Sequence, residues 1–254
     1  MPLIKWLSNQ KCDASGDGAR FRGLSGLIVA GCLAIFLVGM NMPAQTQPDA
    51  AAILASVAKT YGPVSEYELE FEASGDSASP ATYEITHIAF RSPNQYRVEL
   101  ASQLRTPEKD GSASLTSVMV FDGSRWWGYR PSLKLYRTET EDVSHLDADA
   151  LGIGSYRDPL GGFKRRGGQA MRFLKVDRLS AGDGKSHDCF VVELDFREGT
   201  NRLWIEKGTY FVLRSEQPGG SIISYRKIEL NKHLSQETFR FTPPPGAQKA
   251  ERPQ

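Results

Sequence analysis

Phe190-Val191-Val192-Glu193-Leu194-Asp195-Phe196 is the stretch that decides the fold of this chain. Apolar side chains recur at every second position from Phe190 to Phe196, which is typical of a strand with one buried face. Turn residues follow at 198–201, the alternation resumes over 202–206, and another strand begins at Tyr210. Three strands joined by tight turns predict an antiparallel meander.

Most of the chain beyond residue 45 repeats this pattern. Over 66–73, apolar residues point to one face and four glutamates to the other. Because alternate residues on a strand splay outward in a line, we interpret the glutamates as a solvated face rather than a cation site. We therefore expect a mainly β (α+β) fold, an incomplete antiparallel β-barrel of about eleven strands. The predicted strands cover 66–73, 82–91, 94–104, 115–121, 125–130, 133–138, 171–179, 189–196, 202–206, 210–214, 221–230 and 238–241.

One helix and one insertion interrupt the strands. Asp49 is a good N-cap, apolar residues recur at helical spacing from Ala50 to Tyr61, and Gly62 and Pro63 end the pattern. Residues 139–170 are rich in glycine and include an expected short helix over 143–151. Such insertions often act as lids or mouths of a site. We expect the helix and the insertion together to form a lid on the barrel.

The first 44 residues have the pattern of a secretory signal. Basic residues precede an uncharged apolar run over 24–38, and a small residue, Ala44, lies at the expected cleavage point. An uncleaved membrane anchor is the alternative, because the basic region is long and Met42 stands poorly at the −3 position. Lipid attachment at Cys32 is a further alternative, since Val29-Ala30-Gly31-Cys32 is similar to a lipoprotein-processing box. We predict a signal or anchor at 1–44, a periplasmic domain at 45–246 and a disordered tail at 247–254.

Charge and cysteine content limit the function classes. Without residues 1–44, basic and acidic residues are nearly balanced, which argues against nucleic acid as a partner. Cys189 is then the one remaining cysteine, so no intramolecular disulfide is expected. The four histidines are scattered, and no pair has metal-ligand spacing. In His187-Asp188-Cys189, Asp188 points away from its two neighbours, which argues against catalysis. We expect no enzyme, no cofactor and no metal.

The sheet is too wide for its helix. A twelve-residue helix is roughly 18 Å long, whereas eleven strands lie about 4.8 Å apart. The insertion, closure of the sheet on itself or a guest molecule must cover the rest of the apolar face, and an acyl chain suits a secreted protein without catalytic residues. The candidate residues for an apolar cavity are Leu69, Phe71, Tyr96, Val98, Trp127, Tyr129, Phe190, Leu194 and Leu203.

Short motifs add a resemblance to a known family. Residues 120–131, Val-Phe-Asp-Gly-Ser-Arg-Trp-Trp-Gly-Tyr-Arg-Pro, resemble a hairpin of the LolA/LolB superfamily of periplasmic lipoprotein carriers. Residues 239–246, with two phenylalanines and three prolines, resemble the C-terminal motif of that superfamily. Arg91-Ser92-Pro93-Asn94 is similar to its Arg-Pro-Asn segment, and the 49–61 helix occupies the place of its first helix. The order of the motifs agrees along nearly all of the chain beyond the targeting segment.

The resemblance implies a half-barrel with a helical lid and an apolar cavity for acyl chains. It implies lipid or lipoprotein as cargo, membrane-protein donors and acceptors, and a monomer. Arg91 would contact the lid, although Ser92 shifts it by one residue, and such a slip reverses the face of a strand residue. The alternative function is an RseB-like envelope sensor, or another protein-binding module of the same fold without enzymatic activity.

Overall fold

The computed structural model describes residues 47–75, 82–104, 113–139 and 152–250. They contain the helices α1 (Ala50–Tyr61), α3 (Gly154–Arg157) and α4 (Pro159–Arg165). The strands are β1 (Glu66–Ser74), β2 (Thr82–Arg91), β3 (Gln95–Leu104), β4 (Ser114–Phe121), β5 (Trp126–Arg130), β6 (Leu135–Glu139), β7 (Ala170–Ser180), β8 (Ser186–Phe196), β9 (Gly199–Glu206), β10 (Val212–Glu216), β11 (Ile222–Leu230) and β12 (Gln248–Lys249).

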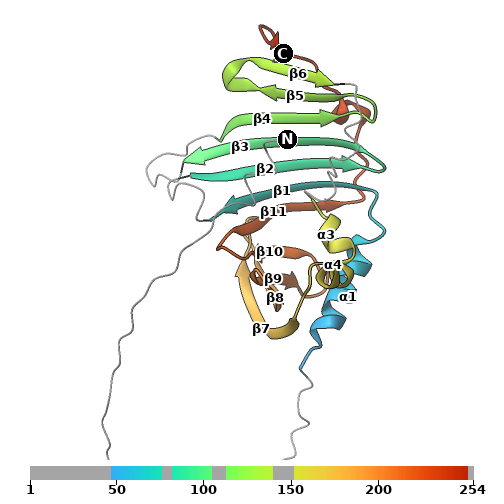
Figure 1. Ribbon diagram of the computed structural model, residues 1–254, viewed down its shortest axis with the longest axis vertical. Coiled ribbons are helices and arrows are strands. Elements are labelled where there is room, and N and C mark those ends of the chain that lie inside the picture. Colours follow the sequence, from blue (N-terminus) through green and yellow to red (C-terminus); the bar gives the residue numbers. More distant parts are fainter. Residues whose placement is uncertain (1–46, 76–81, 105–112, 140–151, 251–254) are drawn as a thin grey trace, which may run out of the picture. The chain divides into compact units, whose positions relative to one another are not determined.

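All twelve strands belong to one open sheet. Their order is β12-β6-β5-β4-β3-β2-β1-β11-β10-β9-β8-β7, so the two outermost strands do not pair and the barrel stays incomplete. Neighbouring strands are antiparallel except β12 and β6, which run parallel. Figure 1 shows α1, α3 and α4 grouped beside the β7–β11 half of the sheet. The predicted half-barrel with a helical lid is confirmed. The expected helix over 143–151 and the targeting segment lie outside the described residues.

Helix α1 forms where its capping residue and apolar pattern predicted it. The Asp49 carboxylate accepts a hydrogen bond from the Ala51 backbone N–H at 3.1 Å, which satisfies one of the free donors of the first turn. Leu54, Val57 and Tyr61 recur at helical spacing and are fully buried. They belong to the same apolar cluster as the sheet residues beneath α3 and α4. We call this side of the sheet the inner face and the opposite side the outer face.

The C-terminal segment covers part of the outer face. Residues 238–241 were predicted as a strand, but Gln236–Phe239 is a short 3-10 helix. Phe239 is fully buried against Ala89, and the Phe241 ring lies 5.7 Å from Trp127. The prediction was wrong because alternating phenylalanines can dock on an apolar face as well as pair at a sheet edge. Beyond them, Gln248–Lys249 pairs with β6, so the predicted tail contains a short strand.

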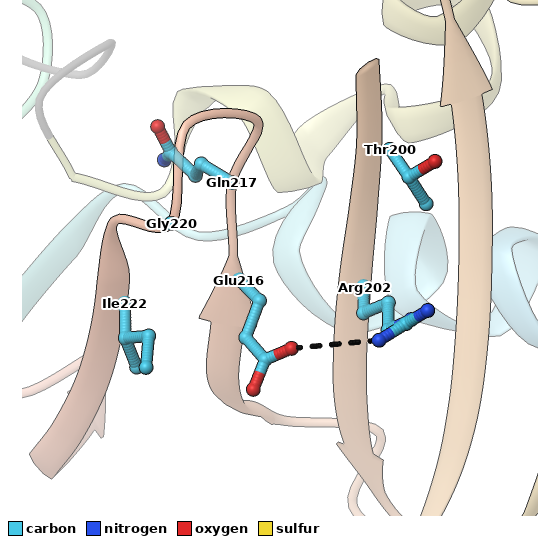
Figure 2. Close-up of a pocket in the computed structure, with 6 residues that line it drawn as sticks. All are labelled: Thr200, Arg202, Glu216, Gln217, Gly220 and Ile222. Atoms are coloured by element: carbon cyan, nitrogen blue, oxygen red, sulfur yellow. Dashed lines mark ion pairs between the residues drawn. The ribbon is translucent and has the colours of Figure 1, made fainter. Parts of the chain in front are cut away.

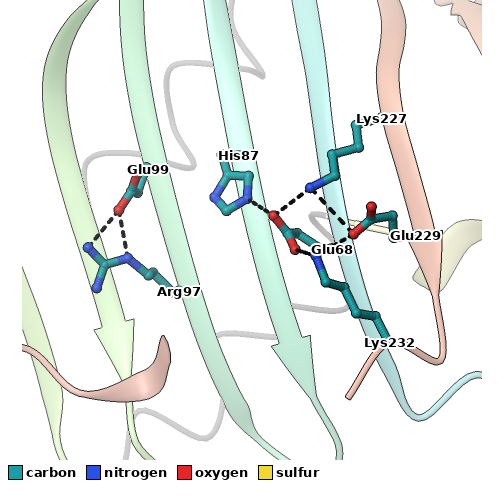
Figure 3. A network of polar contacts seen from close by, with 7 residues as sticks. All are labelled: Glu68, His87, Arg97, Glu99, Lys227, Glu229 and Lys232. Atoms are coloured by element: carbon teal, nitrogen blue, oxygen red, sulfur yellow. Dashed lines mark hydrogen bonds and ion pairs between the residues drawn. The ribbon is translucent and has the colours of Figure 1, made fainter. Parts of the chain in front are cut away.

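The glutamates of β1 are not simply solvated. Glu66 pairs with Arg91 at 3.2 Å, and Glu72 pairs with Arg226. Glu68 contacts three cationic or histidine side chains from β2 and the β11 region (Figure 3). The predicted outer face of β1 is therefore correct, but it is tied to both neighbouring strands by half-buried ion pairs.

Candidate functional site

A row of aromatic side chains crosses the inner face. In the ladder between neighbouring strands, Tyr67 lies opposite Phe90, Phe90 opposite Tyr96, and Tyr96 opposite Phe121. Phe121 in turn lies opposite Trp126. Because directly opposed residues share a face, five aromatic residues from five consecutive strands form one line. The Tyr67 and Phe90 rings stack with centroids 5.0 Å apart. We call this set the aromatic row.

An aliphatic row runs beside the aromatic row, on the same side of it in every strand and two residues away from it. Leu69 opposes Ile88, Ile88 opposes Val98, and Val98 opposes Met119. The row ends at Gly128, where an added Cβ would lie 2.4 Å from the Trp126 ring. The indole therefore lies along the strand over Gly128. Together the two rows give β1–β5 a broad apolar inner face.

The β7–β11 half continues this apolar surface beneath the helices. Val192, Leu194 and Ile205 are buried in the same cluster as α1. The Phe163 ring of α4 lies 5.4 Å from the ring of Phe196. The space between helices and sheet is thus occupied by the protein's own side chains among the described residues.

Three tyrosines connect the helices to the sheet. The Val212 backbone N–H donates to the Tyr61 hydroxyl oxygen at 3.1 Å, and the Tyr225 hydroxyl donates to that of Tyr156 at 3.3 Å. Burial raises the pKa of each of these phenols. They are neutral hydrogen-bonding groups and give no sign of acid–base activity.

Arg157 holds the C-terminal end of α1. Its Nη1 donates to the backbone carbonyls of Tyr61 at 3.3 Å, Gly62 at 3.2 Å and Val64 at 2.6 Å. These carbonyls follow the last turn of α1, where a cation also interacts favourably with the helix dipole. The sequence analysis missed this residue, because its only signal was a basic residue inside a glycine-rich insertion.

Seven of the nine predicted cavity residues lie on or against the inner cluster. They are Leu69, Phe71, Tyr96, Val98, Phe190, Leu194 and Leu203.

Trp127 and Tyr129 lie on the outer face instead, in a cluster with Val118 and Val120. Their predicted inner position was wrong, and Trp126 is the tryptophan of this hairpin that lies on the inner face. The sequence of the β4–β5 hairpin gave no basis for deciding which of its two faces is the inner one, because β4 is apolar on both faces. In the structure, the C-terminal segment covers the outer face.

Arg91 contacts the C-terminal segment, where the resemblance implied the lid. Its guanidinium donates to the Leu234 carbonyl and, at 3.1 Å, to Gln236 Oε1. It also lies 5.0 Å above the Phe239 ring. Among the described contacts, the attachment to the lid that was expected of Arg91 is made by Arg157 instead.

Two hollows lie away from the inner face. One, of about 330 Å³, is lined by Thr200, Arg202, Glu216, Gln217, Gly220 and Ile222. Figure 2 shows it with the Arg202–Glu216 ion pair, whose charged atoms are 4.0 Å apart. The other, of about 230 Å³, includes His187, Glu206 and Leu213. His187 lies between two carboxylates, 2.5 Å from Glu206 and 3.1 Å from Asp183.

Cys189 and the histidine and acidic side chains are the remaining candidates for reactive or metal-binding groups. Burial raises the pKa of the Cys189 thiol to about 12, which leaves it a poor nucleophile. No group of three histidine, cysteine or acidic side chains within the described ranges could hold a metal ion. None of the helices in those ranges is long and apolar enough to cross a membrane.

Among the comparisons with known proteins, only the one with solved structures gave matches. No family model and no curated protein matches the sequence. Among solved structures, LprF from Mycobacterium bovis is similar at 13% identity, with 78% of this chain and 97% of that chain covered and a TM-score of 0.43. A LolA superfamily protein from Nitrosomonas europaea shares 11% identity over 76% of this chain and 98% of that chain, with a TM-score of 0.29.

The Pseudomonas aeruginosa MucA/MucB complex is a further similar structure. Its matching chain shares 13% identity with a TM-score of 0.42; 77% of this chain is covered, but the match spans only 62% of that chain. Because all three identities are below 25% and all three TM-scores are below 0.5, no argument is drawn from these structures, and the functional proposal rests on the residues of this chain.

Proposed function

We propose that the domain is a non-enzymatic, periplasmic carrier that shelters an acyl chain of a lipid or lipoprotein against the inner face. The observation that supports this proposal is the continuous apolar surface made by the aromatic and aliphatic rows and the β7–β11 cluster. Each methylene of a guest chain buried there contributes about 0.8 kcal/mol. A sixteen-carbon chain therefore offers about 12 kcal/mol before ordering costs.

The attachment of α1 suits a lid that opens from one end. Among contacts between described residues, its side-chain hydrogen bonds to β10 and to the turn before it are made by Thr60 and Tyr61, both in the last turn. Arg157 contacts the same end. The first two turns are held by apolar contacts of Ile53, Leu54 and Val57, which an acyl chain can replace.

A carrier of this kind is closed when empty. The side chains beneath α1 fill the interior, so a guest must displace the helices. Loading and release then depend on partners that favour the open state, such as a membrane-protein donor and acceptor.

Native mass spectrometry of the gently purified protein tests the proposal. We expect bound lipid in the wild type and its loss in Met119→Glu, which places a charge at a half-buried position of the aliphatic row. Leu115→Glu, at a position on the same strand that is already 41% exposed, is the matched control and should retain the lipid. An empty wild type, or a folded Met119→Glu that keeps its lipid, would contradict the proposal.

A protein-binding module is the second candidate, and the β7 edge favours it. This eleven-residue strand ends the sheet, and Leu174 and Val176 on it are 38% and 48% exposed. An extended peptide can add to such an edge as a further strand. Copurification of a peptide with a consistently lipid-free protein would favour this function over the carrier.

A further inference from the structure

Two buried hydrogen-bond donors on the inner face have no acceptor among the described residues. The Tyr96 hydroxyl and the Trp126 Nε1–H are shielded from solvent, and neither has a hydrogen-bond partner in the part of the chain that the structure describes. Tyr96 is only 4% exposed. Burial raises its pKa to about 12, so the phenol keeps its proton and remains a donor at neutral pH.

Both donors belong to the aromatic row. Tyr96 and Trp126 flank Phe121 on either side, which places their backbones about 10 Å apart at the usual strand spacing. The aliphatic row lies directly beside them: Val98 and Met119 stand two residues from Tyr96 and Phe121, and the Trp126 indole lies over Gly128. A molecule on this surface would therefore meet both polar donors and aliphatic side chains.

Unpaired buried donors are costly, and phenylalanine would avoid the cost. Leaving such a group without an acceptor lowers the folding stability, because its hydrogen bonds to water are lost and not replaced. Tyr225, another buried tyrosine of the inner cluster, shows the ordinary solution, because its hydroxyl donates to the Tyr156 hydroxyl oxygen within the protein. An acceptor for Tyr96 and Trp126 is therefore expected from outside the described residues.

We propose that Tyr96 and Trp126 donate hydrogen bonds to the carbonyl oxygen of an acyl ester or amide, whose hydrocarbon chain lies along the aliphatic row. This inference rests on the proposed carrier function and specifies the part of the lipid that is recognised. A carbonyl matches the site because it is an acceptor without a donor of its own, and it is directly attached to the chain that the neighbouring side chains contact.

Calorimetric titration with two lipids tests this recognition. The lipids are monopalmitoylglycerol, which has an ester carbonyl, and the corresponding hexadecylglycerol ether, which has none. The wild type should bind the ester more tightly. Tyr96→Phe removes a single hydroxyl and should weaken ester binding by about 3- to 10-fold while leaving ether binding unchanged. Trp126→Phe should act in the same direction.

Tyr129→Phe is the matched control, because Tyr129 is a buried tyrosine of the outer face; it should alter neither affinity. Thermal unfolding of the empty Tyr96→Phe protein should show equal or higher stability. If wild type and Tyr96→Phe bind both lipids alike, the recognition of the carbonyl is refuted and the carrier stands. If the wild type binds neither lipid, the carrier function fails and this inference fails with it.

Discussion

Glu68 shows how much one side chain contributes to the outer face. Its Oε1 lies 2.9 Å from both His87 Nε2 and Lys227 Nζ, and its Oε2 lies 2.7 Å from Lys232 Nζ (Figure 3). Burial raises the pKa of this carboxyl, but the hydrogen bonds from Lys232, His87 and Lys227 outweigh burial and lower the pKa to about 2. The single carboxylate thereby joins β1 to β2 and β11.

Glu68→Gln should destabilise the protein at neutral pH by about 1–3 kcal/mol, because it removes the charge that these partners share. A lowered folded-state pKa contributes stability that is complete above the unfolded value of 4.5 and is lost as pH falls toward 2. The difference between wild type and variant should therefore shrink over that range. Urea unfolding at a series of pH values measures it.

Glu237→Gln provides the control at this scale. Glu237 also pairs with an arginine, at 2.6 Å, but its side chain is 72% exposed, and such pairs contribute little. Equal effects of the two substitutions, or a Glu68→Gln effect independent of pH, would show that the Glu68 contacts do not stabilise the sheet.

At the scale of elements, α1 depends on α3 for its attachment. Arg157→Ala removes three hydrogen bonds to carbonyls at the C-terminal end of α1. Hydrogen bonds from a charged donor contribute about 1.5–3 kcal/mol, so the amides of α1 should exchange about 10- to 100-fold faster. The amides of β2 and β3 should keep their protection. Hydrogen exchange followed by mass spectrometry measures both regions.

Arg165→Ala is the comparison for this experiment, since Arg165 is a 70%-exposed arginine on the adjacent helix α4. It should leave α1 protection unchanged, whereas Arg157→Lys should retain part of the protection. If α1 opens as a lid, Arg157→Ala should also take up lipid faster, because the open state is more populated. Unchanged exchange in Arg157→Ala would mean that apolar contacts alone hold the helix.

At the scale of the whole domain, the two sides of the sheet differ in what pairs with their last long strand. The chain's own C-terminal segment pairs with β6 through Gln248–Lys249, while β7 ends the sheet at the other side. An uncovered edge strand offers free backbone donors and acceptors to other chains. We therefore expect the short β12 to shield β6 from pairing with other chains.

Deleting residues 247–254 should uncover β6 and increase the fraction of larger species in light-scattering chromatography. Deleting residues 251–254 alone leaves β12 in place and should behave like the full chain. An unchanged size distribution after the longer deletion would show that β12 does not protect this edge.

Much of the secondary structure could be predicted from local pattern. Alternation identified β1 and β8, and the Asp49 cap with its apolar stripe identified α1. The seven cavity candidates on the inner cluster were also predictable, because each stands at an apolar position in a strand whose other face is largely polar. Trp126 and Trp127 were not, since alternation divides them between two faces without saying which face is inner.

By itself, the sequence determined that the chain forms an antiparallel sheet with one capped helix, because hydrogen bonding and side-chain period are local properties. The tertiary structure alone decided which face the C-terminal segment covers, and hence where Trp127, Tyr129 and Arg91 point. It also decided that Arg157 holds α1 and that Tyr96 and Trp126 have no acceptor in the described part of the chain. These outcomes depend on contacts between segments far apart in the chain, whose energies no local pattern records.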